Sequence, residues 1–173
     1  MKFCAFLRGV NVNGISLKMA EVFQVFTDAG MKGVSSVLAT GNIIFSSDLK
    51  PTELKVILEK ALSGDFNYEA VLFLKTDGEV AEIFAKNPFT QSNDAHIYAF
   101  IGIDDVEEIL LEEFNAKKSE NEKGKIVGKT FYWQVAKGNT LDSAFGKVLG
   151  KKNLKEKMTS RNLNTIEKIG KKF

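Results

Sequence analysis

The order of strand-like and helix-like segments constrains the fold of this chain more than any other feature of its sequence. Over residues 1–75, apolar residues alternate as in strands or recur at helical spacing, in the order strand, helix, strand, strand, helix, strand. This is the order of the split βαβ, or ferredoxin-like, arrangement. The order nearly repeats after residue 95, where a final helix takes the place of the last strand. We therefore predict an α+β fold of two ferredoxin-like (βαββαβ-type) subdomains packed as one unit, the second ending in helices.

The first subdomain, residues 1–75, opens with a segment that is apolar on both faces. Phe3 and Ala5 share one face of an extended chain, and Cys4 and Phe6 share the other. The expected segments are a strand over Lys2–Gly9, a turn-rich stretch over Gly9–Ser16, a helix from Met19 to Gly30, a hairpin of Val34–Ala39 and Ile43–Ser46, a helix from Pro51 that ends at Gly64, and a strand over Tyr68–Lys75.

A connecting helix and loop over residues 76–94 lead to the second subdomain, residues 95–173. Its last segment, Arg161–Ile169, has a helical pattern with Thr159 or Ser160 as the cap. The expected segments are a connecting helix over Asp77–Lys86, a strand over His96–Ile103, a helix over Val106–Phe114, a hairpin of Lys125–Val127 and Thr130–Ala136, a helix over Leu141–Leu149 and the final helix.

The composition excludes several classes of protein. With 44% hydrophobic and 27% charged residues, the chain can form a core. No apolar run approaches the roughly 18 residues of a membrane span, and no signal-peptide pattern follows Met1, so we expect a soluble cytoplasmic protein without a membrane partner. One Cys and one His exclude a zinc, disulfide or iron–sulfur site within one chain, so we predict no metal and no cofactor. We expect Cys4 to be an inert buried thiol and His96 a structural or surface residue.

The charge is distributed unevenly along the chain. Residues 1–103 carry a net charge of −2, residues 104–122 carry −6 and residues 123–173 carry +10. A strongly basic segment is typical of contact with phosphate groups or nucleic acid, because binding releases counterions. The alternative is that the acidic stretch lies against the basic one, or that both are solvated faces.

Three short motifs, at the beginning, middle and end of the chain, form a distinctive set. They are Leu7-Arg8-Gly9-Val10-Asn11-Val12-Asn13-Gly14 followed by Lys18-Met19, then Thr40-Gly41-Asn42, and Thr159-Ser160-Arg161-Asn162-Leu163-Asn164-Thr165. Together they resemble a bacterial family, the domain-of-unknown-function family 1697, over essentially the whole chain. Asn13 stands where that family usually has glycine, and Leu163 where it usually has tryptophan. The resemblance implies an α+β fold of two similar subdomains and brings no established reaction, substrate or cofactor.

The first motif has the chemistry of an anion-binding loop. Gly9–Gly14 leaves a strand and leads to a helix, and glycine-rich turns and helix N-termini bind anions through free N–H groups. Arg8 could fork onto a phosphate or carboxylate, and Lys18 could add a point charge. The other two motifs could complete the same pocket. The predicted ligand-binding residues are Arg8, Asn11, Asn13, Lys18, Asn42, Arg161 and Asn162; no catalytic residue is predicted.

A structural interpretation of these residues stays open. Asn11, Asn13 and Asn42 are residue types that satisfy backbone groups in turns. Arg8 could pair with an acid, and Arg161 could be a surface residue at a helix start. The sequence therefore does not settle whether the motifs bind a ligand or shape the backbone.

Three functional hypotheses follow. The preferred one is a non-catalytic module that binds an anionic or phosphate-bearing ligand, either a small molecule or nucleic acid. The second is a small-molecule enzyme with its site between the two subdomains. The third is a protein-interaction or homo-oligomeric assembly domain, in which an apolar sheet face pairs with another copy, for example in a homodimer.

Overall fold

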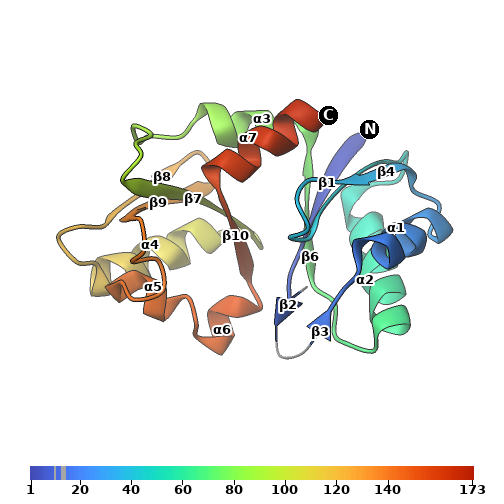
Figure 1. The fold of residues 1–173 in the computed structure, drawn as a ribbon, viewed down its shortest axis with the longest axis horizontal. Helices are drawn as coiled ribbons and strands as arrows, with labels where there is room; N and C mark the ends of the chain where they lie inside the picture. Colours follow the sequence, from blue (N-terminus) through green and yellow to red (C-terminus); the bar gives the residue numbers. More distant parts are fainter. Residues whose placement is uncertain (10, 13–14) are drawn as a thin grey trace. The chain divides into compact units, whose positions relative to one another are not determined.

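The structure, a computed structural model, describes residues 1–9, 11–12 and 15–173 (Figure 1). The chain forms two compact units. Residues 1–81 and 168–173 make up what we call the N-terminal unit, and residues 82–167 the C-terminal unit. The division falls within two helices, α3 (Asp77–Ala85) and α7 (Leu163–Lys172). Among the helices that the structure describes, none has the length and apolar character needed to cross a membrane.

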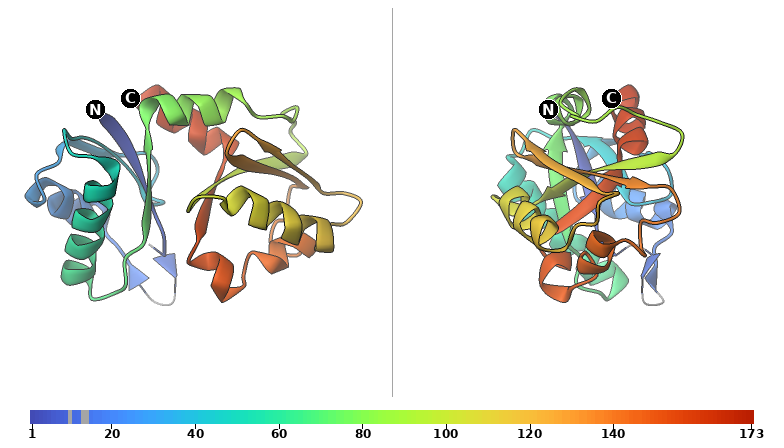
Figure 2. Two further views of the ribbon diagram at one scale, coloured as in Figure 1. Left: turned by 180° about the vertical axis from the view of Figure 1, so that it is seen from behind. Right: turned by 90° about the vertical axis from the view of Figure 1, so that its left-hand side faces the viewer.

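The N-terminal unit is a four-stranded antiparallel sheet with the strand order β4-β5-β1-β6. Two helices pack on one face of this sheet (Figures 1 and 2). A small hairpin of two-residue strands lies in the predicted turn-rich stretch. The elements are β1 (Lys2–Leu7), β2 (Asn11–Val12), β3 (Ile15–Ser16), α1 (Met19–Asp28), β4 (Lys32–Ser36), β5 (Asn42–Ser46), α2 (Pro51–Phe66) and β6 (Leu72–Thr76).

Strand β1 is the central element of the N-terminal unit and is buried on both faces, as its sequence predicts. Phe3, Ala5 and Leu7 belong to the core that α1 and α2 cover. Cys4 and Phe6, on the opposite face, have no exposed surface. The expectation that Cys4 is a buried thiol is therefore confirmed.

The C-terminal unit has the same architecture, with the sheet order β10-β7-β9-β8. When the strands are numbered within each four-stranded sheet, both sheets have the order fourth, first, third, second, which is the ferredoxin-like order. Its core is a cluster of aromatic rings that includes Phe100, Phe131, Trp133 and Phe145. The elements are β7 (Ala95–Gly102), α4 (Val106–Lys117), β8 (Lys123–Val127), β9 (Thr130–Ala136), α5 (Ala144–Val148), α6 (Lys152–Lys155) and β10 (Met158–Asn162).

The predicted α+β fold of two ferredoxin-like subdomains is confirmed, but the prediction for its last elements is wrong. A last strand, β10, is present and pairs with β7 from Met158 to Asn162. The final helix begins at Leu163, so Arg161 is a strand residue and neither Thr159 nor Ser160 caps the helix. Partners distant in sequence decide this segment, because β10 gains its backbone hydrogen bonds from β7.

Several helix boundaries also differ from the prediction by a few residues; α4, for example, extends to Lys117. Helix α2 runs through Gly64 to Phe66 and ends at Asn67, whose φ of 49° is left-handed. Gly in a helix costs about 1 kcal/mol, which the packing of Leu62 and Phe66 in the core offsets. Helix α5 begins at Ala144, and Leu141 is 81% exposed rather than part of the helix.

Candidate functional site

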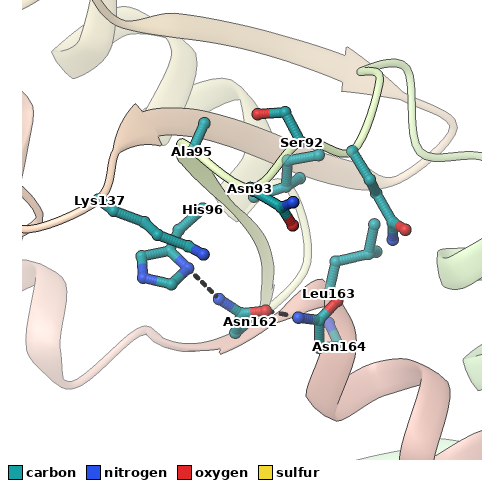
Figure 3. A pocket seen from close by; sticks show the side chains of 10 residues that line it. Ser92, Asn93, Ala95, His96, Lys137, Asn162, Leu163 and Asn164 are labelled. Carbon is teal, nitrogen blue, oxygen red and sulfur yellow. Dashed lines mark hydrogen bonds between the residues drawn. The ribbon is translucent and has the colours of Figure 1, made fainter.

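A polar pocket of about 210 Å³ lies on the C-terminal unit (Figure 3). It forms where the loop before β7, the start of β7, the end of β9 and the junction of β10 with α7 come together. Every residue that lines it belongs to the C-terminal unit. The lining residues are Gln91, Ser92, Asn93, Ala95, His96, Ile97, Lys137, Asn162, Leu163 and Asn164.

The antiparallel pairing of the sheet brings these segments to one end. Asn162, the last residue of β10, pairs with Tyr98 of β7, and His96 lies two residues earlier on the same face. His96 and Asn162 are therefore diagonal neighbours. Lys137 follows β9, and its backbone N–H donates to the carbonyl oxygen of Asp94 at 2.9 Å. Strand register thus positions three of the polar side chains of the pocket, those of His96, Lys137 and Asn162.

The amide of Asn162 connects His96 to the first turn of α7. Asn162 Oδ1 accepts the backbone N–H of Asn164 at 3.0 Å, which turns Nδ2 toward His96. Asn162 Nδ2 lies 3.0 Å from His96 Nδ1 (Figure 3). Because Nδ2 has only hydrogens to donate, Nδ1 is the acceptor, and the neutral imidazole carries its hydrogen on Nε2. The hydrogen-bond chain therefore selects one tautomer of His96.

The pocket is electrostatically suited to an anion. Lys137 is the one charged side chain among the described residues that line it, and none of those residues is acidic. Lys137 is exposed, and its amino group extends across the His96 ring in Figure 3. Asn162 already uses Oδ1 and one hydrogen of Nδ2, while the amides of Gln91, Asn93 and Asn164 add further donors and acceptors. These groups can hold a negatively charged ligand of small size by hydrogen bonds and one ionic contact.

The residues predicted from the first motif lie in the N-terminal unit. The backbone N–H of Arg8, just after β1, donates to the carbonyl oxygen of Val71 at 3.0 Å, and the residue is half-buried. Lys18 is exposed at the start of α1, and its Nζ lies 3.6 Å from Glu21 Oε1. Asn11 is in β2, while the prediction for Asn13 falls outside the described residues.

Asn42 has a structural role in the hairpin of the N-terminal unit. It has no exposed surface, and its Nδ2 donates to the carbonyl oxygen of Val37 and to Thr40 Oγ1, each at 3.0 Å. Gly41, between Thr40 and Asn42, has a φ of 75°, a conformation that favours glycine. The central motif thus holds together the turn between β4 and β5.

The two residues predicted from the third motif differ in their surroundings. Arg161 Nη1 donates to Thr159 Oγ1 at 2.7 Å and to the carbonyl oxygen of Ser160 at 2.8 Å. Among the predicted ligand-binding residues that the structure describes, Asn162 is the one that lines the pocket. Its position confirms no ligand, but it places part of the third motif in a polar cavity.

Sequence reasoning missed His96 and Lys137 as pocket residues. The sequence predicts a structural or surface role for His96, because the chain has no second His and its one Cys lies in an apolar strand. Its partner is instead an amide, Asn162, which is distant in sequence and belongs to a strand that the sequence did not reveal. The polar run Gln91-Ser92-Asn93-Asp94 before an apolar strand was the available signal.

The fold defines an α+β protein made of two ferredoxin-like units, and comparisons with known proteins agree. Residues 1–132 match the family described as Protein of unknown function (DUF1697), and the chain belongs to this family. A solved structure of a conserved bacterial protein from Streptococcus pneumoniae is similar, with a TM-score of 0.80 and 21% sequence identity. The match covers 98% of this chain and 97% of that one. No curated protein matches the sequence.

Proposed function

We propose that this protein binds a small ligand that carries a phosphate or carboxylate group, and that the ligand occupies the pocket of the C-terminal unit. The observation that carries the proposal is that Lys137 is the sole charge among the described lining residues, and that the other polar side chains of the lining are amides, one hydroxyl and one imidazole. Without a neighbouring carboxylate in that lining, the ammonium group attracts an external anion. A charge-assisted hydrogen bond from Lys137 then supplies the main ionic contact.

The net charge of the C-terminal unit does not favour either sign of ligand. Residues 123–167, which include Lys137 and Asn162, carry a net charge of +7, and residues 82–122 of the same unit carry −7. The attraction of an anion therefore rests on Lys137 in the lining of the pocket. We leave Arg8 and Lys18 out of this site, because the pocket forms within the C-terminal unit alone.

A titration followed through His96 tests the proposal. The chain has one His, so its imidazole signals in an NMR spectrum are assigned without further variants. Inorganic phosphate and acetate, added separately at constant ionic strength and pH, should shift these signals in a saturable manner. Signals that do not move at millimolar concentrations of either anion would overturn the proposal.

Lys137→Met provides the matched test of the ionic contact. Loss of one charge-assisted hydrogen bond should weaken phosphate binding by about tenfold or more. Lys129→Met is the control, because Lys129 is exposed in the same unit and does not line the pocket. Equal weakening in both variants would mean that the net charge attracts phosphate and that the pocket does not bind it.

A further inference from the structure

Resting on the function proposed above, we infer that the ligand is a small sugar phosphate, with an anionic group joined to a body rich in hydroxyl groups and without a nucleobase. Three features of the pocket lead to this class of ligand. They are the number of amide side chains, the absence of a Phe, Tyr or Trp ring from the described lining, and the volume of the pocket.

The amide side chains match hydroxyl groups. Four amide side chains line the pocket. Asn162 is half-buried, and the other three, Gln91, Asn93 and Asn164, are exposed. Each amide offers two N–H donors and an acceptor oxygen, and each sugar hydroxyl is both a donor and an acceptor. A body with several hydroxyls therefore pairs with this lining better than an apolar body, which would leave the amides without partners.

The lining offers poor contacts to a nucleobase. Proteins hold unpaired bases by stacking them on aromatic rings or guanidinium planes. The only ring among the described lining residues is the imidazole of His96, which hydrogen-bonds Asn162 and lies edge-on to Tyr98 with 6.0 Å between ring centroids. Trp133, the nearest large ring to Tyr98 in the aromatic core, is 1% exposed. A base bound here would therefore lack the usual stacking surface.

The volume favours a small ligand. Pockets for drug-sized ligands usually measure about 300–1,000 Å³, and this one measures about 210 Å³. A phosphate group on Lys137 leaves room for a short polyol beside Gln91 and Asn93. The geometry thus favours a phosphate with a small hydroxylated body over a complete nucleotide.

Four probes separate this inference from the proposed function: inorganic phosphate, ribose, ribose 5-phosphate and adenosine 5′-monophosphate. Binding of each is measured by calorimetry and by the His96 NMR signals. Ribose 5-phosphate should bind about tenfold more tightly than phosphate, since two or three added hydrogen bonds each contribute a little. Ribose alone should show no binding, and the monophosphate nucleotide should bind no more tightly than ribose 5-phosphate.

Each outcome has a distinct meaning. If phosphate binds and ribose 5-phosphate binds no better, the proposed function stands and the sugar-phosphate inference is wrong. If the nucleotide binds tenfold more tightly than ribose 5-phosphate, the pocket recognises a base and the inference is again wrong. If none of the four binds, the proposed function fails, and the inference fails with it.

Variants of the amide side chains locate the hydroxyl contacts. Asn93→Ala combined with Gln91→Ala should remove the advantage of ribose 5-phosphate over phosphate, because it lowers the affinity for ribose 5-phosphate more than the affinity for phosphate. Asn153→Ala, an exposed amide in α6 that does not line the pocket, is the control and should preserve both affinities. A double variant that keeps the full advantage would contradict the inference.

Discussion

Glu122 accepts the indole N–H of Trp133 inside the C-terminal unit, with 3.2 Å between Oε1 and Nε1. The same oxygen accepts the backbone N–H of Phe145 at 3.3 Å. Oε2 accepts the backbone N–H and the hydroxyl of Ser119 at 3.0 and 2.8 Å. Glu122 is only 5% exposed, and its contacts with Trp133 and Phe145 are buried. One carboxylate therefore ties the segment before β8 to β9 and to the start of α5.

Glu122→Gln should destabilise the protein. The amide places a donor where one oxygen now accepts, so at least one of the partners loses its hydrogen bond inside the unit. An unpaired buried donor costs about 1–3 kcal/mol, and we expect the free energy of unfolding in urea to fall by this amount. Glu120→Gln, an exposed neighbour, should change it by less than about 0.5 kcal/mol. Equal stability of the two variants would show that the Glu122 contacts contribute nothing.

The same carboxylate should make stability depend on pH in the acidic range. Burial by itself raises the pKa of Glu122, but hydrogen bonds from Ser119, Ser143 and Phe145 outweigh it and lower the pKa below the ordinary value of 4.5. Because the folded state binds this proton less readily than the unfolded state, the stabilisation is complete above pH 4.5 and is lost as pH falls through the lowered pKa. The stability difference between wild type and Glu122→Gln should therefore narrow in acid. A difference that is constant from pH 7 to below pH 4 would refute this.

Glu122 also shows where prediction from sequence ends. Glu122 is the last residue of the acidic stretch, residues 104–122, which the sequence predicts to be solvated or to lie against the basic tail. Whether a carboxylate is exposed depends on donors that tertiary structure supplies, here Trp133 and Phe145. No local pattern contains that information.

The fold was more predictable than the site because most elements have apolar periodicity of their own. Strand β1 and helix α1 follow directly from the spacing of their buried residues. Strand β10 has the polar run Ser160-Arg161-Asn162, and only its pairing with β7 makes it a strand. The pocket depends on that pairing, since it brings Asn162 to His96, and so the pocket was missed together with the strand.

Tyr132 should contribute stability that is lost in alkali. Its hydroxyl donates to the carbonyl oxygen of Ile83 at 2.7 Å, and burial raises the pKa of Tyr132 to about 12 from an ordinary value of 10.0. The unfolded state therefore loses this proton first as pH rises. The stabilisation is complete below pH 10 and disappears as pH approaches 12.

Tyr132→Phe removes the hydroxyl and leaves the Ile83 carbonyl without this donor. We expect a loss of about 1 kcal/mol at pH 7, measured by urea unfolding, and a smaller difference from wild type above pH 10. Tyr98→Phe is the comparison, because it also removes one tyrosine hydroxyl from the same unit. Tyr98 is half-buried, and its hydroxyl oxygen lies 3.3 Å from Thr140 Oγ1. A Tyr132→Phe deficit that stays the same or grows in alkali would rule out the raised pKa as the cause.

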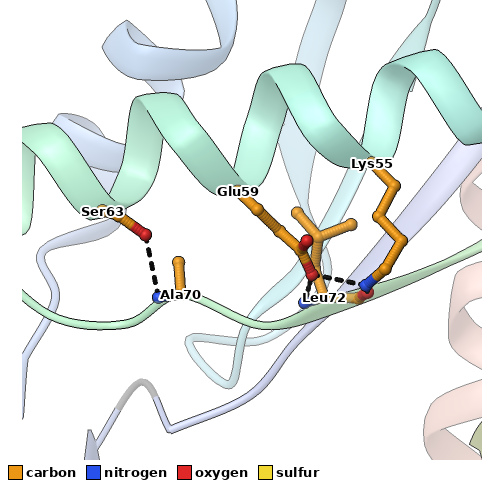
Figure 4. Close-up of polar contacts among 5 residues, drawn as sticks. All are labelled: Lys55, Glu59, Ser63, Ala70 and Leu72. Atoms are coloured by element: carbon orange, nitrogen blue, oxygen red, sulfur yellow. Dashed lines mark hydrogen bonds and ion pairs between the residues drawn. The ribbon is translucent and has the colours of Figure 1, made fainter.

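Side chains of α2 bind backbone groups at one edge of the N-terminal sheet, at and just before the start of β6. Strand β6 is an edge strand, and Glu59 Oε1 accepts the backbone N–H of Leu72 at 3.0 Å (Figure 4). Lys55 Nζ pairs with Glu59 and donates to the carbonyl oxygen of Leu72 at 2.6 Å, and Ser63 Oγ accepts the backbone N–H of Ala70 at 3.0 Å. These contacts occupy backbone groups that an edge strand would otherwise offer to another chain.

Glu59→Ala should loosen this edge. Without the carboxylate the Leu72 N–H has no acceptor from α2, and its hydrogen exchange with solvent should accelerate by about tenfold, equivalent to about 1.4 kcal/mol. NMR measures exchange at this single amide. Glu69→Ala, an exposed acid close in sequence, should leave the rate unchanged. If exchange at Leu72 is equally slow in both variants, Glu59 does not protect the strand.

Asn162→Asp should reverse the tautomer of His96. The carboxylate offers acceptors only, so the oxygen facing His96 Nδ1 requires a hydrogen on that nitrogen, and the neutral ring then carries no hydrogen on Nε2. The ¹⁵N signals of the single imidazole distinguish the two nitrogens and read the change directly. Asn162→Asp also adds a negative charge beside Lys137, so phosphate binding should weaken by about tenfold or more.

Asn164→Asp is the control for added charge, because the backbone N–H that orients Asn162 is retained. If Asn164→Asp weakens binding and leaves the tautomer intact while Asn162→Asp changes both, Asn162 positions the ring. Wild-type protein with its hydrogen on Nδ1 would contradict the hydrogen-bond chain itself.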